Sequence, residues 1–342
     1  MSDPVIEVRD LKLRFPSLDG TEVVHAVDGV SFRIEAGETF GIIGESGSGK
    51  STIGRVLVGL LNPSDGDIVF AGRSRSSISG REWRKARRGF QMIFQDSNAA
   101  LNPRMTILDS LIEPMRIAGG RSREEMRETA LAALVRVGLR PDMAQRYPHE
   151  LSGGQKQRVN IARILPLEPR LVVCDEVVAA LDVSIRGEIL NLFRDLQRDL
   201  GLAYAFIAHD ISVVAQISDR VAVTYLGRFV ELGATGDVIE RALHPYTVAL
   251  LSAEPQPLPR ALRDDRRLVL QGDIPSPVNP PSGCRFHTRC PWATEICGRV
   301  DPEWRELRSG HRVACHHATP EGLPSPGRAG TREMTATWEE TS

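Results

Sequence analysis

One short segment constrains the fold of this chain more than any other: Gly44, Glu45, Ser46, Gly47, Ser48, Gly49, Lys50 and Ser51. It fits the pattern G-x-x-x-x-G-K-[ST], in which glycines let successive backbone N–H groups converge on phosphate oxygens. A buried strand is expected before it and a helix after it, a context that an ordinary glycine–serine loop would lack. We predict that Lys50 contacts the β- and γ-phosphates of a nucleotide and that Ser51 ligates Mg²⁺.

Short apolar runs alternate with helical segments along most of the chain. The strand candidates are 5–8, 30–34, 39–43, 171–174 and 203–208, and the helix candidates are 53–61, 126–139 and 185–200. Residues 104–145 are expected to be mostly helical. Strands that alternate with helices predict an α/β fold with a mostly parallel sheet covered on both faces.

An acidic pair, Asp175 and Glu176, ends the apolar run 171–174. Neighbouring strand residues point to opposite sides, so the pair can do two jobs. Asp175 is expected to hold Mg²⁺ through water, and Glu176 is expected to reach the attacking water as general base. Without a phosphate loop, two solvated acids at a strand end would be the simpler interpretation.

A second glycine-framed element, Ser152, Gly153, Gly154 and Gln155, stands before another helix. It offers N–H donors at the positive end of that helix. A second phosphate-binding element in one chain is explained if it serves a nucleotide held by another subunit. Spacing alone leaves the alternative of a simple helix cap open.

Four motifs together resemble the nucleotide-binding domain of an ABC transporter: the phosphate loop, LSGGQKQR at 151–158, the apolar-DE run at 171–176 and Ala208-His209-Asp210. They occur in the family's order, and the resemblance covers roughly residues 5–255. It implies an ABC cassette of the P-loop NTPase class with a mixed sheet. The cassette would occupy 1–254, with an inserted helical subdomain at about 97–160, and would bind ATP with Mg²⁺.

The resemblance also implies roles for single residues. Gln95 would sense Mg²⁺ and the attacking water and link to the membrane subunits. His209 would contact the γ-phosphate, and Asp182 would communicate across a dimer. Thr52 would lie near the α-phosphate. Phe15 is the expected adenine-stacking residue, and the alternative, His25, stays open because of an insertion before Val27.

The chain departs from the family pattern directly after Glu176. Val177, Val178 and Ala179 stand where proline and a small hydroxyl residue are usual. Loss of proline adds a backbone N–H and some freedom to this turn. We expect this change to affect the turnover rate more than the mechanism, because the acidic pair is intact.

The C-terminal part has a different composition. Prolines 255, 257 and 259 mark a boundary, followed by a Cys-rich segment, 255–318, and a tail, 319–342, that is expected to be disordered. His244-Pro245-Tyr246-Thr247, residues 274–291 and residues 91–104 resemble the ATPases of dipeptide and oligopeptide importers. Nickel importer subunits are close relatives of these.

Four cysteines fall in that segment: Cys284, Cys290, Cys297 and Cys315. In a reducing compartment such a group suggests a metal before disulfides. The spacing C-x5-C-x6-C-x17-C lacks the C-x2-C pairs of zinc ribbons. The resemblance implies a [4Fe–4S] cluster, as some members of the subfamily bind one. Zinc and free thiols stay open as alternatives, with His311, His316 and His317 as other ligand candidates.

Several bulk features limit the function. No stretch of about 18 apolar residues occurs, and the start, MSDPVIEVRD, does not read as a signal peptide. The net charge of −1 gives no case for nucleic acid as a partner, and the basic run 81–88 is expected to be a solvated helix face.

The sequence thus predicts an ATP-hydrolysing subunit that energises an importer of dipeptides or oligopeptides. The resemblance implies a peripheral position at the cytoplasmic face of the inner (plasma) membrane. The implied partners are a second ATPase subunit, identical or related, two membrane permeases and an extracytoplasmic solute-binding protein. The alternatives are import of nickel or another solute, a soluble ABC ATPase outside transport, and a non-hydrolysing structural subunit.

Overall fold

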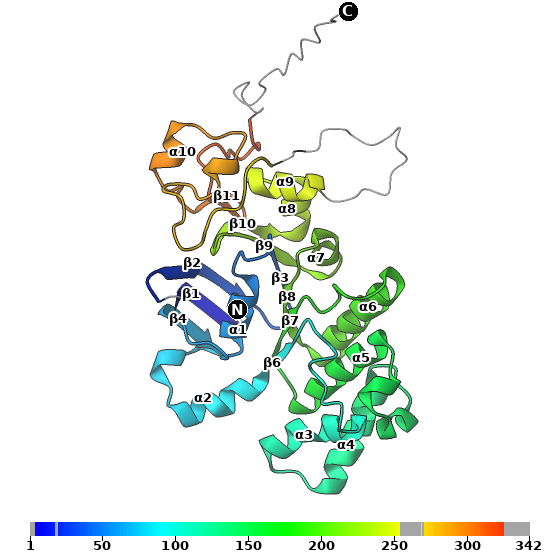
Figure 1. Ribbon diagram of the computed structural model, residues 1–342. Helices are drawn as coiled ribbons and strands as arrows, with labels where there is room; N and C mark the ends of the chain where they lie inside the picture. The colour runs from blue at the N-terminus through cyan, green and yellow to red at the C-terminus, as the bar shows by residue number, and fades with distance from the viewer. Residues whose placement is uncertain (1–3, 18–19, 254–267, 269, 325–342) are drawn as a thin grey trace, which may run out of the picture.

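The computed structural model describes residues 4–17, 20–253, 268 and 270–324. The proline-rich boundary at 255–259 and the tail beyond residue 324 lie outside the described residues. Figure 1 shows the helices of residues 107–164 at one end of the molecule and the C-terminal segment at the opposite end. The main sheet lies between them.

The main sheet has the order β11-β12-β10-β9-β3-β8-β7-β6. Its members are β3 (Thr39–Ile43), β6 (Phe90–Ile93), β7 (Leu171–Asp175), β8 (Ala203–Ile207), β9 (Arg220–Tyr225), β10 (Arg228–Ala234), β11 (Arg305–Arg308) and β12 (His311–Val313). Neighbours from β9 to β6 pair in parallel, and β10 is antiparallel to β9. The predicted α/β fold with a mixed sheet is confirmed.

A smaller antiparallel sheet packs against the main one, in the order β2-β1-β4-β5. Its strands are β1 (Ile6–Pro16), β2 (Val23–Ile34), β4 (Asp65–Phe70) and β5 (Arg73–Ser74). β1 alternates buried and solvated residues over much of its length, as a sheet with one solvated face does. Phe32 of β2 stacks on Phe40 of β3 with ring centroids 5.0 Å apart. This contact joins the two sheets.

Helices cover both faces of the parallel strands. Helix α1 (Lys50–Leu57) buries Ile53 and Val56 in the core shared with the small sheet. On the other face, α6 (Val183–Leu200) sets Phe193 edge-on against Tyr204 and Phe206 of β8. The shorter helices are α7 (Ile211–Ile217), α8 (Thr235–Glu240) and α9 (Pro245–Ala253). β3, β7 and β8 are therefore buried along their full length.

The chain between β6 and β7 is mostly helical, as predicted. It contains α3 (Ile107–Ala118), α4 (Arg123–Arg136) and α5 (Gly153–Ile164), which pack on one another. α4 begins three residues before the predicted start because Ser122 and Glu125 form a capping box. The 3₁₀ turns among the described residues are η1 (Arg75–Ser77), η2 (Arg87–Gly89), η3 (Pro141–Gln145), η4 (Pro148–Glu150), η5 (Leu165–Leu167) and η7 (His287–Arg289).

The basic run forms helix α2 (Gly80–Ala86), with Ser79 and Glu82 as its capping box. Only Trp83 of this helix is buried, and its ring packs against Phe70. The basic run is therefore a solvated helix face, as the sequence predicted. Trp83 is the residue that packs this helix against the core. No helix among the described residues is long and apolar enough to cross a bilayer.

Residues 270–324, here called the C-terminal extension, continue the main sheet. β12 pairs with β10 in antiparallel register, with Glu231 opposite Val313. His311 Nε2 lies 2.7 Å from Glu231 Oε1, and both side chains are fully buried. The same Glu231 carboxylate accepts the backbone N–H groups of Leu243 and His244. One buried carboxylate thus joins the extension, β10 and the start of α9. The short helix α10 (Glu295–Arg299) completes the extension.

Removal of the His311 ring should loosen this junction. His311→Ala leaves the Glu231 carboxylate buried without its imidazole partner, which should cost about 3–5 kcal/mol of unfolding free energy. The matched control is Arg312→Ala on the same strand, whose ion pair with Glu306 is about half exposed and should contribute ~0–1 kcal/mol. Urea denaturation of the two variants checks this. Equal midpoints would contradict the assigned role of the Glu231–His311 pair.

Candidate active site

The phosphate loop lies between β3 and α1, as predicted, and its glycines are required by close backbone contacts. Gly44 has φ 150°, and a Cβ there would lie 2.1 Å from the carbonyl oxygen of Thr224. Gly49 has φ 99°, and its Cβ would lie 2.3 Å from the carbonyl oxygen of Ala26. The loop is therefore pressed against β9 and β2, and any side chain at these two positions would push it away.

The Lys50 ammonium lies inside the curve of the loop. It donates to the carbonyl oxygens of Gly44 and Glu45, each at 2.8 Å, and its side chain is almost fully buried. Burial lowers the pKa of Lys50, while the carboxylates of Glu176, Asp175 and Glu45 oppose that shift. A buried cation framed by a glycine loop at a helix N-terminus suits a polyphosphate.

Ser51 and Asp175 meet across the edge of the sheet. The Ser51 hydroxyl donates to Asp175 Oδ1 at 2.8 Å, which links α1 to the end of β7. Burial raises the pKa of the Asp175 carboxyl, and the bond from Ser51 opposes this. Mg²⁺ takes oxygen ligands and keeps several of its sites for waters and substrate phosphates. A hydroxyl and a carboxylate beside a phosphate loop fit an ion that arrives with a nucleotide.

Glu176 is held by two residues from other strands. Gln95, which follows β6, donates its side-chain N–H to Glu176 Oε2 at 2.6 Å. His209, which follows β8, places Nδ1 3.7 Å from Glu176 Oε1. The Glu176 backbone has φ 51°, an unusual conformation for a residue with a side chain, and its N–H donates to the Ile207 carbonyl. The three residues predicted as catalytic are therefore together.

The departure from the family pattern after Glu176 has a packing explanation. Val177 and Val178 are both buried in the main core cluster. The turn still closes, because the Ala179 N–H donates to the Glu176 carbonyl at 3.1 Å. Buried valines thus hold a turn that proline stiffens in the family pattern.

Ser152 forms a helix cap in this chain. Its hydroxyl accepts the Gln155 N–H at 3.3 Å, and its own N–H donates to Gln155 Oε1 at 3.0 Å. Asp182, at the start of α6, is exposed. Within the described residues, neither Ser152 nor Asp182 forms a hydrogen bond or ion pair with the phosphate loop. Both therefore lie outside the group that surrounds Lys50.

The adenine-stacking candidates lie on the small sheet. Phe15 of β1 is half-buried and pairs with Val24 of β2, and His25 donates its N–H to the Pro277 carbonyl of the extension. Thr52 lies on the first turn of α1. The roles of Phe15, His25 and Thr52 stay predictions.

Two residues of the loop's surroundings were missed by the sequence analysis. Arg289 of the extension forms two hydrogen bonds to the Glu45 carboxylate, at 2.7 and 3.0 Å. The Tyr246 hydroxyl accepts the Glu45 N–H at 2.8 Å. Both stand in segments that the sequence analysis singled out, but local spacing cannot link positions more than two hundred residues apart.

The predicted iron–sulfur cluster is not supported. All four cysteines, Cys284, Cys290, Cys297 and Cys315, are free thiols, and the described part of the chain contains no group of three or more histidine, cysteine or acidic side chains placed to hold a metal ion. Burial raises the pKa of Cys284 to about 11 and that of Cys290 to about 12.

The same observation gives no support for the zinc alternative, and the three histidines have other contacts. His311 pairs with Glu231, and His316 Nε2 lies 2.9 Å from the Val300 carbonyl oxygen. His317 Nε2 is 3.4 Å from the Cys297 sulfur. Free thiols in a small packed fold, the third alternative, stay a prediction.

Comparison with known proteins gives two family matches. Residues 27–179 match the family described as ABC transporter. Residues 230–297 match the family described as oligopeptide/dipeptide transporter, C-terminal region. The second match runs from β10 through most of α10, so it spans the junction between the cassette and the extension.

Relatives match most of the chain. The oligopeptide transport ATP-binding protein AppF of Bacillus subtilis is 48% identical over 320 residues, which cover 92% of this chain and 97% of AppF. The oligopeptide transport ATP-binding protein OppF of Escherichia coli is 48% identical over 324 residues, with the same two coverages.

Solved structures agree with these relatives. The structure of cbiO1 from Clostridium perfringens, part of the ABC transporter complex cbiONQ, has a TM-score of 0.62 and 31% identity. It covers 70% of this chain and 91% of its own. A dimeric post-hydrolysis state of the ATP-binding cassette MJ0796, bound to ADP and Pi, has a TM-score of 0.60 and 29% identity, covering 67% of this chain and 98% of its own.

These matches and the geometry agree. The phosphate loop with Lys50, the Ser51–Asp175 contact and the group around Glu176 lie at one edge of a mixed sheet. The resemblance inferred from the sequence is confirmed by relatives that align with almost the whole chain. The chain belongs to the ABC transporter family of ATP-binding proteins.

Proposed function

We propose that this chain hydrolyses ATP as one of two ATPase subunits that energise an importer of dipeptides or oligopeptides. The observation that carries the ATPase is the Glu176 carboxylate, held by Gln95 and His209 beside the buried Lys50. The peptide cargo is supported by the names of AppF and OppF and by the C-terminal family match. Nickel or another solute remains the second candidate cargo, from the sequence resemblance.

The residues divide the chemistry among them. The N–H groups of the phosphate loop and Lys50 bind the β- and γ-phosphates. Mg²⁺ would be held by Ser51, with Asp175 behind a water, and Gln95 would sense it. Bound there, the ion would neutralise phosphate charge. Glu176 accepts a proton from the attacking water, while Gln95 and His209 fix the position of its carboxylate.

A single chain supplies only half of the residues that surround each nucleotide in our proposal. Ser152 and Gly153 are exposed at the N-terminus of α5, where the helix dipole favours an anion. Exposed Asp182 starts the neighbouring α6. In our proposal these residues, with Gly154 and Gln155, cover the nucleotide held by a second ATPase subunit, identical or related. The dimeric state of the MJ0796 cassette supports this arrangement.

A groove beside Gln95 suits a docking partner. It has a volume of about 950 Å³ and lies between the sheet edge at β6 and helices α3 and α5. Phe94 and Ile117 line it and are exposed, at 44% and 79%. We propose that each ATPase subunit binds one of two membrane permeases here, so the chain is peripheral at the cytoplasmic membrane face. A solute-binding protein on the other side would deliver the peptide.

Replacement of the general base should stop turnover without loss of nucleotide binding. Glu176→Gln removes the proton acceptor, and steady-state ATP hydrolysis should fall about 10²–10⁴-fold. ATP-dependent dimers should persist, measured by light scattering. The matched control is Glu168→Gln, whose carboxylate is 84% exposed, and which should hydrolyse ATP normally. Hydrolysis by Glu176→Gln monomers at the parent rate would sink the proposal.

Loss of the buried ammonium should weaken nucleotide binding. Lys50→Ala removes charge-assisted hydrogen bonds, and ATP affinity should fall by about 1.5–3 kcal/mol. Isothermal titration measures the dissociation constant. Lys85→Ala, at an exposed position of α2, serves as control and should bind ATP as the parent does. Unchanged binding by Lys50→Ala would rule out the phosphate loop as the nucleotide site.

A further inference from the structure

We propose that Arg289 of the C-terminal extension is a positioning residue for the phosphate loop, so that the ATP affinity of the cassette depends on the extension being docked. The inference rests on the proposed ATPase function and deepens it. It assigns a role in nucleotide binding to a segment outside the match to the ABC transporter family, which ends at residue 179.

The contact between Arg289 and Glu45 is well formed. The two terminal nitrogens of the guanidinium reach the two carboxylate oxygens separately, the bidentate geometry that gives this pair both strength and direction. The Arg289 side chain is 8% exposed and that of Glu45 is 25% exposed. The guanidinium also lies over the Tyr225 ring, 5.9 Å from its centroid. A buried planar cation of this kind restricts where Glu45 can lie.

The loop residue that Arg289 contacts, Glu45, carries a charge that is unfavourable for binding an anion. Glu45 is an acid in a loop built to bind an anion, and its carboxylate is close enough to Lys50 to oppose the fall in pKa of that ammonium. Without a partner, this charge would repel a triphosphate. Arg289 neutralises it, and Tyr246 fixes the adjoining N–H. The extension thus makes the loop less negative and holds its second residue in place.

A second arginine of the extension reaches the same loop indirectly. Arg285 donates to the Leu226 carbonyl oxygen and to Asp28 of β2. Leu226 has φ 44°, and the next residue, Gly227, donates its N–H to the Ser48 carbonyl of the phosphate loop at 3.0 Å. Arg289 ends the 3₁₀ turn η7, and Arg285 lies two residues before the start of that turn. A shift of this turn would therefore disturb the loop at two places, Glu45 and Ser48.

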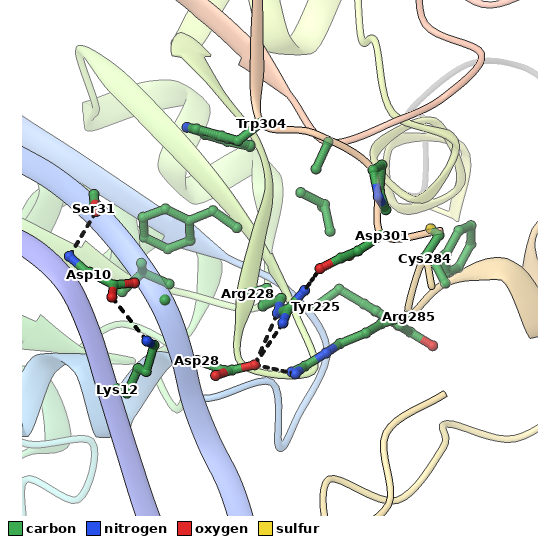
Figure 2. A pocket seen from close by; sticks show the side chains of 17 residues that line it. Asp10, Lys12, Asp28, Ser31, Tyr225, Arg228, Cys284, Arg285, Asp301 and Trp304 are labelled. Atoms are coloured by element: carbon green, nitrogen blue, oxygen red, sulfur yellow. Dashed lines mark hydrogen bonds and ion pairs between the residues drawn. The ribbon is translucent and has the colours of Figure 1, made fainter. Parts of the chain in front are cut away.

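The Arg285 contact lies on the wall of a cavity of about 310 Å³ between the small sheet, β9, β10 and the extension (Figure 2). Asp28 accepts from both Arg228 and Arg285, and Arg228 also binds Asp301 of the extension. The ion pairs of Asp28 with Arg285 and of Arg228 with Asp301 thus join the extension to the cassette. These ion pairs fix the part of the extension that carries Arg289, so its guanidinium stays beside the phosphate loop.

The test measures ATP hydrolysis by the full chain against ATP concentration. Arg289→Ala should raise the KM for ATP about tenfold, within the range typical of coupling between sites, and change kcat much less. Arg289→Lys, which cannot form the bidentate pair, should be intermediate. The matched control is Arg299→Ala, which removes another extension arginine, whose partner Glu295 is exposed. Its KM should equal that of the parent.

A second substitution separates charge compensation from a loss of folding. In the Arg289→Ala background, Glu45→Gln removes the uncompensated carboxylate and should recover about threefold or more of the lost affinity. The defect of Arg289→Ala alone should also shrink as salt is raised. A KM unchanged by Arg289→Ala, or a raised KM that neither Glu45→Gln nor salt relieves, would overturn the proposal.

A failure of the Arg289 inference can be distinguished from a failure of the proposed ATPase function. If the parent chain hydrolyses ATP and Lys50→Ala does not bind it, the ATPase stands, and the Arg289 variants alone decide the inference. If Arg289→Ala does not fold, the comparison of Arg289→Lys with Arg289→Lys plus Glu45→Gln decides it in the same way. A parent chain without ATP hydrolysis would overturn both proposals together.

Discussion

The parallel pairing of β3, β8 and β7 is the constraint on which the rest of the site depends. These strands are buried along their length, so their register is fixed by packing on both faces. Their carboxyl ends meet at one edge and deliver the phosphate loop, Asp175 with Glu176, and His209 to the same place. Ligand sites of open α/β sheets form at this edge. The Ser51–Asp175 hydrogen bond closes the gap between the first two of these segments.

Prediction from the sequence succeeded where the signal was local. The phosphate loop and the end of β7 follow from spacing and from apolar runs, and both are where they were expected. The roles of Gln95 and His209 were implied only by resemblance. Their contacts with Glu176 were not predicted, because three separate strands bring the residues together. The pairing of β12 with β10 and the Arg289–Glu45 contact had no local signal. The cysteine spacing predicted a metal cluster, which the described residues do not support.

Ser152 shows how one local structure supports two interpretations. Its capping box with Gln155 satisfies the start of α5 without any ligand, so the cap alone explains the residue types. The same cap leaves Ser152 and Gly153 exposed at a positive helix end. Stability of the helix and recognition of a partner's nucleotide therefore do not compete. This is why a single chain cannot distinguish them and an assembled dimer can.

The extension changes how the cassette should be divided. By composition it is a separate segment after a proline-rich boundary, but its strand β12 continues the main sheet and its buried His311 shares Glu231 with β10 and α9. Arg289, at the end of η7, contacts the phosphate loop directly, and Arg285 contacts Leu226, next to the Gly227 that bonds to the loop. Each arginine adjoins a half-buried cysteine, Cys284 or Cys290, that packs against the main core cluster. In our proposal the nucleotide site and the extension are therefore coupled through these contacts. A change in the position of the extension should alter ATP affinity, and ATP binding should alter the docking of the extension.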